Sequence, residues 1–295
     1  MTVRERRTKA QMTTLRRQMS GALKNDHPQS VRHVFYLETN PTLEEWVEKS
    51  DAGYVTVQRT LVAMRREGLI PYGWITDATR QGYFTQTWND PADAVAHVAS
   101  LYRRSYWATA PVYLEVWCES RSIAGVIRGD CERYAVPLYP AGGFASLSLT
   151  WRAAQHIAGE AARPIAGLAR GRPVHVLYVG DYDPAGLLID RNIEAELRRH
   201  LPDTEIHFHR LAITAEQIVL MGLPTKPAKE GDRRGGFTGS TVEAEAMPAG
   251  VLRGLLRDAI EKFIDPRELA ALKAAEESER YWLYTFAREM QEGTL

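Results

Sequence analysis

The stretch VLYVGDYDPAGLLID, residues 176–190, places the strongest constraint on the fold of this chain. An apolar run, VLYV, leads into Asp181 and Asp183, and Pro184 and Gly186 then open a segment with a helical pattern. A strand that is apolar on both faces is typical of a buried parallel sheet, and open α/β sheets hold their ligands at the carboxyl ends of their strands. Because side chains alternate along an extended chain, the two aspartates are expected to point to the same side.

Strand and helix patterns alternate from residue 111 onward. We expect strands at 112–119, 135–143, 173–181 and 205–213, the second of them continuing into a loop, with helices at 122–134, 144–161 and 184–200. This order predicts a small, mostly parallel sheet of the α/β class. A strongly amphipathic helix is expected over 251–263, and the tail to residue 295 has a helical pattern.

The first third of the chain is polar, and its patterns are mainly helical. Helices are expected at 8–23, 31–38 and 54–67, followed by a short strand-like segment, IPYGWI, at 70–75. The third helix carries Arg59, Arg65 and Arg66 on one face. This is the outline of a winged helix-turn-helix, in which basic residues contact DNA phosphates. The alternative is an ordinary amphipathic helix whose charges are solvated.

The length of 295 residues accommodates two domains. We expect a winged-helix domain over 1–90, a helical linker over 91–110 that includes a helix at 92–106, and a domain over 111–295. Basic residues gather in 1–24, although the whole chain balances 37 basic against 37 acidic residues. Two cysteines make neither a zinc quartet nor a disulfide framework, and no long apolar run or signal-peptide core is present. The expected location is the cytoplasm.

Three carboxylates fall at predicted strand ends. Glu119 closes the strand at 112–119, and Asp181 and Asp183 follow the strand at 173–181. If these strands are neighbours, the three groups meet at one edge of the sheet, where hard oxygen ligands suit Mg²⁺. The alternative is a simple turn, in which Asp183 caps the next helix and Pro184 occupies its first position.

This arrangement resembles the toprim domain, which topoisomerases, bacterial primases and some nucleases share. The resemblance covers about residues 111–210 and rests on Glu119, on the glycine-containing loop YPAGGF, and on Asp181 and Asp183 in that order. It implies a Rossmann-like sheet that holds Mg²⁺ through these three carboxylates.

A second motif extends the resemblance to most of the chain. The sequence SVRHVFY, residues 30–36, is similar to the active-site motif of the DNA-cleaving subunit of topoisomerase VI, a type IIB topoisomerase, and of the related meiotic double-strand-break transesterase. The segments GDYDPAG and VEAEAMPAGVLRGLLRDAI also resemble later parts of that family. The most similar group is the short, stand-alone members of the family found in bacterial mobile elements and phages.

The resemblance implies that Tyr36 attacks a phosphodiester of double-stranded DNA, with Arg32 as its electrostatic neighbour. It also implies a nucleoid-associated homodimer in which each Tyr36 meets the metal site of the other chain. The family's separate GHKL-type ATPase partner engages a region ahead of the motif that is short in this chain. His33 stands where the family commonly has an acid.

Three functional hypotheses remain open from the sequence. The first is a DNA topoisomerase-like transesterase that cleaves both strands through a phosphotyrosyl bond. The second keeps the metal site but uses water, which gives a nuclease. The third is a catalytically silent DNA-binding protein of a mobile element. An unperturbed phenol, with a pKa of about 10, is a weak nucleophile, so the first hypothesis requires a cation or base beside Tyr36.

Overall fold

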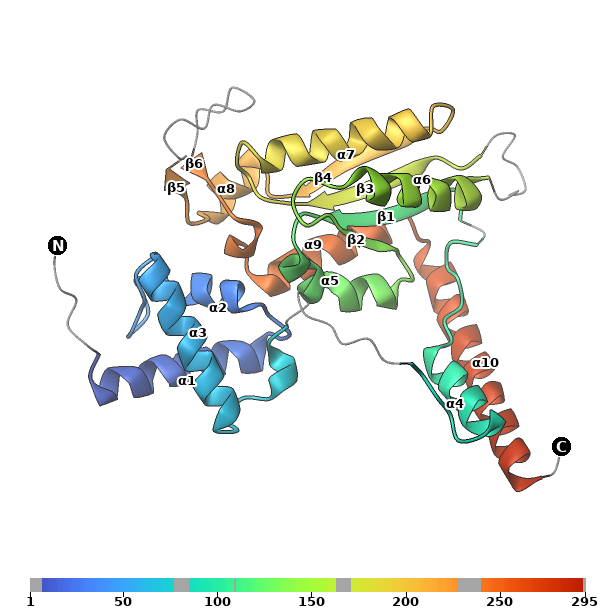
Figure 1. The fold of residues 1–295 in the computed structure, drawn as a ribbon, viewed down its shortest axis with the longest axis horizontal. Helices are drawn as coiled ribbons and strands as arrows, with labels where there is room; N and C mark the ends of the chain where they lie inside the picture. Colours follow the sequence, from blue (N-terminus) through green and yellow to red (C-terminus); the bar gives the residue numbers. More distant parts are fainter. Residues whose placement is uncertain (1–6, 77–84, 109, 163–170, 228–239, 294–295) are drawn as a thin grey trace.

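The computed structural model describes residues 7–76, 85–108, 110–162, 171–227 and 240–293 (Figure 1). Its amino-terminal part contains α1 (Lys9–Asn25), α2 (Val31–Glu38), α3 (Asp51–Arg66) and the 3₁₀ helix η1 (Tyr72–Trp74). Each of these α-helices begins where a side-chain hydroxyl, from Thr8, Ser30 or Ser50, accepts a backbone N–H of the first turn. The expected helices at 8–23, 31–38 and 54–67 are thus confirmed, and Ser30 is the cap of the second.

The strand expected at 70–75 is absent, and that prediction was wrong. Residues 72–74 form η1, and Ile75 makes only an isolated bridge with Gln29. Pro71 has no N–H to donate to a neighbouring strand. A short apolar segment forms a strand only where a neighbouring strand can hydrogen-bond with it. Here Tyr72 of the segment contacts Arg65 of α3 instead.

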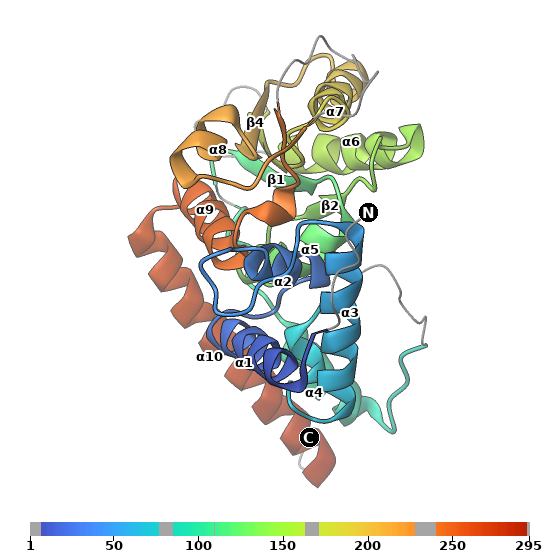
Figure 2. The ribbon, with the colours of Figure 1, turned by 90° about the vertical axis from the view of Figure 1, so that its left-hand side faces the viewer.

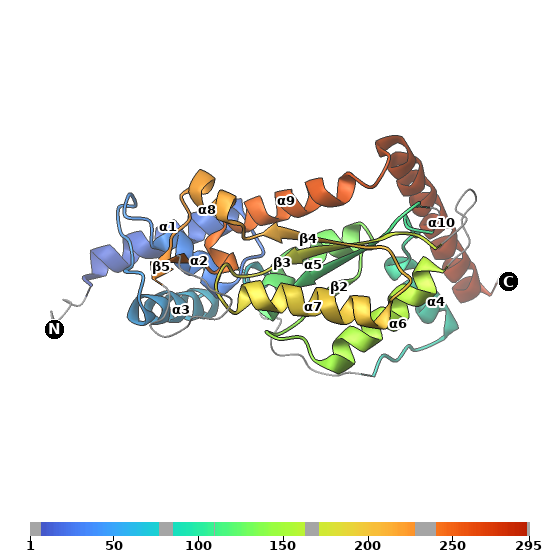
Figure 3. The same cartoon turned by 90° about the horizontal axis from the view of Figure 1, so that it is seen from above.

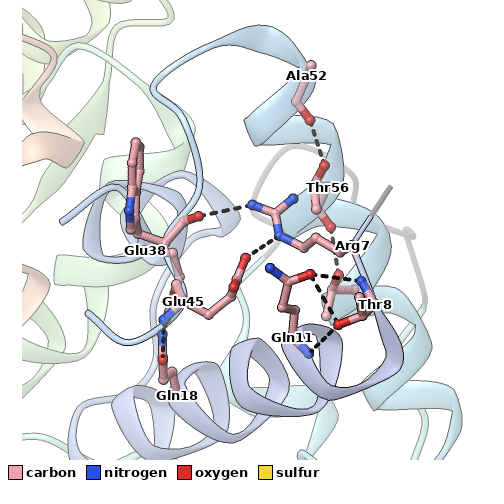
Figure 4. A network of polar contacts seen from close by, with 10 residues as sticks. Arg7, Thr8, Gln11, Gln18, Glu38, Glu45, Ala52 and Thr56 are labelled. Atoms are coloured by element: carbon pink, nitrogen blue, oxygen red, sulfur yellow. Dashed lines mark hydrogen bonds and ion pairs between the residues drawn. The ribbon is translucent and has the colours of Figure 1, made fainter. Parts of the chain in front are cut away.

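A polar network fastens the loop between α2 and α3 to α1 (Figure 4). The Arg7 guanidinium donates to the Glu45 carboxylate at 2.6 Å and to the carbonyl of Trp46 at 3.0 Å. The Gln18 amide donates to the carbonyl of Glu45 at 2.6 Å and to the Glu38 carboxylate at 3.2 Å. These bonds hold the loop that leads to Lys49 in one position.

The second part of the chain is a parallel four-stranded sheet in the order β2-β1-β3-β4. Its strands are β1 (Tyr113–Cys118), β2 (Leu138–Pro140), β3 (Val174–Val179) and β4 (Ile206–Ala212). The helices between them are α5 (Arg121–Arg133), α6 (Leu147–Ala161) and α7 (Gly186–His200). The predicted alternation of strands and helices is confirmed. The second strand is shorter than expected, because most of the segment at 135–143 is loop.

The sheet has a separate apolar core on each face, because side chains alternate along its strands. Tyr113 and Trp117 of β1 pack with α6 and α7, whereas Leu114 and Val116 pack with α5 and the later helix α9 (Ala249–Glu261). Figure 3 shows α9 across the sheet from α6 and α7. The core shared with α5 and α9 continues into α1, α2 and α3. Figure 2 shows α2 between α1 and this layer.

The carboxyl-terminal part adds short elements that no pattern in the sequence predicted. These are α8 (Ala215–Met221), β5 (Lys226–Pro227), its antiparallel partner β6 (Ser240–Thr241) and the 3₁₀ helix η3 (Ala244–Ala246). The expected helices after residue 250 are confirmed as α9 and α10 (Pro266–Glu292). Helix α10 packs along α4 (Pro91–Leu101), which ends five residues before the expected end of the 92–106 helix (Figure 1).

The described helices include none that is both long enough and apolar enough to cross a membrane.

Candidate active site

The carboxylates expected at the sheet edge do lie next to one another. Glu119 directly follows β1, Asp181 follows β3, and these strands are hydrogen-bonded neighbours. The backbone N–H of Asp181 donates to Glu119 Oε2 at 2.9 Å. A Cβ at Gly186 would lie 2.3 Å from the carbonyl oxygen of Asp181 and 3.2 Å from Glu119 Oε2. Only glycine therefore allows α7 to begin this close to the two acids.

Asp183 has a structural role that the sequence left as the alternative. Its Oδ1 accepts the backbone N–H of Gly186, the first residue of α7, at 2.7 Å. The helix begins after Ala185, so Pro184 precedes it and does not occupy its first position. Its charge also contributes to the raised pKa of Glu119, whose largest cause is burial. Capping and participation in an acidic cluster are therefore both features of this residue.

Burial and mutual repulsion raise the pKa values of the carboxyl groups at this edge of the sheet. Burial, followed by the charges of Glu119 and Glu245, raises the pKa of Asp181 to about 8. Burial also raises the pKa of Glu245. A bound cation would favour the ionised forms of these acids.

The oxygen donors suit a hard divalent cation such as Mg²⁺ in chemical type. In their present positions, however, the described residues include no group of three or more His, Cys, Asp or Glu side chains arranged to hold a metal ion. Glu119, Asp181 and Asp183 each use one oxygen to accept a backbone N–H. Each carboxylate keeps a second oxygen, so these hydrogen bonds leave it able to bind a cation, and the Mg²⁺ site stays a prediction.

Arg210 of β4 holds the turn that carries Asp181. Its guanidinium donates to the carbonyl of Asp181, to the carbonyl of Ile213 at 2.8 Å and to the Asp190 carboxylate at 2.6 Å. Sequence reasoning gave Arg210 no role, because its partners come from three separate segments.

Tyr36 and Arg32 lie on α2 and meet a common carboxylate. Tyr36 is buried, with 6% of its surface exposed. Burial first, and then the charge of Glu243 and the hydrogen bond to it, raise the pKa of the Tyr36 phenol. Arg32 Nη1 donates to Glu243 Oε2 at 2.5 Å. In this arrangement Glu243 opposes ionisation of the phenol, while the charge of Arg32 favours it.

Two lysines flank the same tyrosine. Lys49 Nζ lies 5.3 Å and Lys226 Nζ lies 6.0 Å from the centroid of the Tyr36 ring. Lys226 Nζ also donates to Glu243 Oε1 at 2.7 Å. Sequence reasoning assigned neither lysine to the site, because they are 177 positions apart in the chain and reach Tyr36 only through the fold.

The segment that includes η3 connects α2 to the sheet edge. Tyr182 and Val242 exchange backbone hydrogen bonds of 2.8 and 3.0 Å, and the N–H of Ala244 donates to Asp181 Oδ1 at 2.8 Å. Glu243 thus contacts Tyr36 while the adjacent residue contacts Asp181. The spacing of two acids within VEAEAMPAG was the one available signal for Glu243 and Glu245.

Two cavities adjoin this segment. One, of about 480 Å³, is lined mainly by apolar side chains together with His33, Tyr36 and Glu245. The other, of about 420 Å³, is lined by Arg32, Lys49 and Lys226 together with aromatic and small polar residues. Tyr36 lines the apolar cavity, and two lysines of the basic cavity, Lys49 and Lys226, lie over its ring.

The three arginines expected to bind DNA differ in their surroundings. Arg65 Nη2 donates to the carbonyl of Tyr72 at 3.0 Å, and its guanidinium lies 4.8 Å from the centroid of the Tyr72 ring. Arg59 and Arg66 are exposed, and they lie seven residues apart on one face of α3. Arg59 and Arg66 are thus accessible to a ligand, while Arg65 stabilises the turn after α3.

Comparisons with protein-family models, with curated proteins and with solved structures found no match. The function is therefore argued from the residues of the site.

Proposed function

We propose that this chain is a Mg²⁺-dependent transesterase that cleaves double-stranded DNA, similar to the DNA-cleaving subunit of topoisomerase VI. The observation that carries the proposal is the juxtaposition of Tyr36 and Arg32 with the acidic sheet edge through residues 242–245. A tyrosine nucleophile requires a neighbouring cation and a proton acceptor. Arg32 is the cation and Glu243 is the acceptor, and the two form an ion pair beside Tyr36.

The finer domain assignments belong to the same proposal. The helical part of a winged-helix domain at 1–90 is supported by three capped helices and the exposed Arg59 and Arg66, while the described residues 7–76 contain no wing strand. A toprim domain is supported by a parallel sheet whose first and third strands are followed by Glu119 and by Asp181 and Asp183. The nucleoid-associated homodimer and the GHKL-type ATPase partner rest on the sequence resemblance alone.

In the proposed reaction, Tyr36 Oη forms a bond to a DNA phosphorus while the bond from phosphorus to a deoxyribose oxygen breaks. The phenol proton passes to the Glu243 carboxylate, and the departing oxygen takes a proton from water. Arg32 stabilises the negative charge that develops on the phosphate. Mg²⁺ held by Glu119, Asp181 and Asp183 would supply further charge stabilisation.

The test is to incubate the protein with supercoiled DNA and Mg²⁺, to denature the mixture, and to measure protein covalently attached to DNA ends. We expect an adduct that maps to the peptide containing Tyr36. The Tyr36→Phe variant removes only the attacking oxygen, so cleavage should vanish while DNA affinity stays nearly constant. If this variant still cuts DNA, water is the nucleophile and the nuclease hypothesis replaces the proposal. If the parent binds DNA but cuts it under no condition, the silent DNA-binding protein is the better description.

A further inference from the structure

Glu243 is the common acceptor for two cationic donors of the basic cavity. Its Oε2 accepts Arg32 Nη1 at 2.5 Å, and its Oε1 accepts Lys226 Nζ at 2.7 Å. Two cations that converge on one oxyanion form an arrangement that also suits a phosphate group.

The cavity next to Glu243 contains more positive than negative charge. Among the described residues that line it, three are cationic, Arg32, Lys49 and Lys226, and one is acidic, Asp51. Lys49 Nζ donates to the carbonyl of Thr225 at 2.9 Å, which directs the ammonium group toward β5. Burial, and then the nearby charge of Lys226, lower the pKa of Lys49 to about 8. The positive charges therefore repel each other, and an anion in the cavity would relieve that repulsion.

We propose that Arg32, Lys49 and Lys226 form a phosphate-binding site, and that the Glu243 carboxylate occupies part of this site when no phosphate is bound. A phosphate group that enters the cavity takes over Arg32 and Lys226 from Glu243. Because Lys49 and Lys226 also lie over the Tyr36 ring, the incoming group comes to lie near that tyrosine. The identification of this phosphate as a DNA phosphodiester rests on the proposed function, whereas the existence of the site does not.

The proposal makes Glu243 a competitor of the ligand. Replacement of Glu243 by glutamine keeps the shape of the side chain and an amide oxygen for Arg32 and Lys226, but removes the competing negative charge. Phosphate affinity should therefore rise in Glu243→Gln and fall when a cationic side chain is removed. If these residues form only a structural ion-pair cluster, loss of Glu243 loosens α2 and phosphate affinity does not rise in Glu243→Gln.

The experiment is isothermal titration calorimetry of the full chain with inorganic pyrophosphate in EDTA-containing buffer, so that metal binding plays no part. We expect Glu243→Gln to bind pyrophosphate about tenfold more tightly than the parent, and Lys49→Ala and Lys226→Ala about tenfold more weakly. Lys262→Ala, at an exposed lysine after α9, is the matched control and should behave as the parent does. Thermal melts of every variant identify any that fails to fold, and Glu243→Asp, which retains the charge, is the matched control for Glu243→Gln and should bind no more tightly than the parent. If Glu243→Gln fails to fold, the comparison of Lys49→Ala and Lys226→Ala with Lys262→Ala decides the test.

Equal pyrophosphate affinity of the parent and Glu243→Gln would overturn the proposal, as would equal effects of Lys226→Ala and Lys262→Ala. The two proposals fail in different ways. If the pyrophosphate series behaves as expected but the parent never forms a DNA adduct, the phosphate site stands and the transesterase does not. If adducts form through Tyr36 but pyrophosphate affinity ignores Lys49, Lys226 and Glu243, the transesterase stands and this site does not.

Discussion

A carboxylate buried at the end of α2 shows how a single residue connects pH to stability. Glu38 is 1% exposed, and Gln18 donates a hydrogen bond of 3.2 Å to its carboxylate. Burial raises the pKa of Glu38 to about 7, and the hydrogen bond from Gln18 opposes this increase only in part. The folded chain therefore keeps a proton on Glu38 over a pH range in which an exposed glutamate has already released it.

The pH dependence of stability follows from this difference. Between about pH 4.5 and pH 7 the folded state binds more protons at Glu38 than the unfolded state does. The protonated Glu38 side chain thus contributes fully to the free energy of unfolding below about pH 4.5, and this contribution is lost as the pH rises through 7. We expect Glu38→Gln to match the parent near pH 4 and to exceed its free energy of unfolding by up to about 3 kcal/mol at pH 8.

Denaturant unfolding of both proteins from pH 4 to pH 9 measures this effect. Glu44→Gln is the control, because Glu44 is exposed and pairs with Arg17 at the surface. Its difference from the parent should stay small at every pH. A constant difference between parent and Glu38→Gln across the whole pH range would show that Glu38 has an ordinary pKa.

At the scale of elements, α3 combines an internal face and an external one. Leu61 and Met64 are buried in the core, and Arg65 supports η1 through Tyr72. Arg59 and Arg66 remain exposed on the outer side of the helix. A helix with this division can contact DNA phosphates without losing its own packing, because the exposed arginines make no contribution to the core.

DNA binding tests this division. Each phosphate that a protein cation neutralises contributes about −0.9 to the slope of log affinity against log salt concentration. We therefore expect Arg59→Ala with Arg66→Ala to make the slope shallower by about 2 while leaving the melting temperature unchanged. Arg65→Ala should leave the slope unchanged and lower the melting temperature, because it removes the contacts of Arg65 with Tyr72. An unchanged slope in the double variant, measured by fluorescence anisotropy over a salt series, would place the DNA elsewhere.

At the scale of the whole molecule, the segment at 242–245 joins the helical part to the sheet. The Tyr36 hydroxyl and the Asp181 carboxylate contact neighbouring residues of this segment within one chain. The sequence resemblance implies instead that Tyr36 acts with the metal site of a second chain. These contacts lead us to expect that each Tyr36 works with the carboxylates of its own chain.

Mixing two inactive variants distinguishes the arrangements. Tyr36→Phe lacks the attacking oxygen, and Asp183→Asn lacks one acid while retaining a side chain able to cap α7. If each site is built from one chain, a mixture should form no DNA adduct, because every site lacks one part. If the site is shared across a homodimer, mixed dimers contain one complete site and adduct formation should return. Diluting the mixture until light scattering shows single chains, and then concentrating it again, lets the chains exchange and makes a negative result meaningful.

Local features of the sequence were enough to predict most of the longer helices and strands. Hydroxyl caps, apolar periodicity and the VLYV run specify α1, α2, α3 and β3 through contacts between residues close in the chain. The order of strands and helices also predicted a parallel sheet, and Glu119 and Asp181 were expected at one edge if their strands were neighbours, which the pairing of β1 with β3 confirms. These inferences hold because hydrogen bonding and burial within an element depend mainly on its own residues.

Only the tertiary structure decided which distant residues surround Tyr36. Lys49, Lys226 and Glu243 come from a loop, a two-residue strand and the approach to η3. No local pattern distinguishes the two lysines from other surface charges, and the acid pair in VEAEAMPAG does not indicate that Glu243 lies near Tyr36. The same holds for Arg65, which its sequence position grouped with Arg59 and Arg66 but whose guanidinium contacts Tyr72. Pairwise contacts between separated segments depend on how whole elements pack, and periodicity within one element carries no information about its neighbours in space.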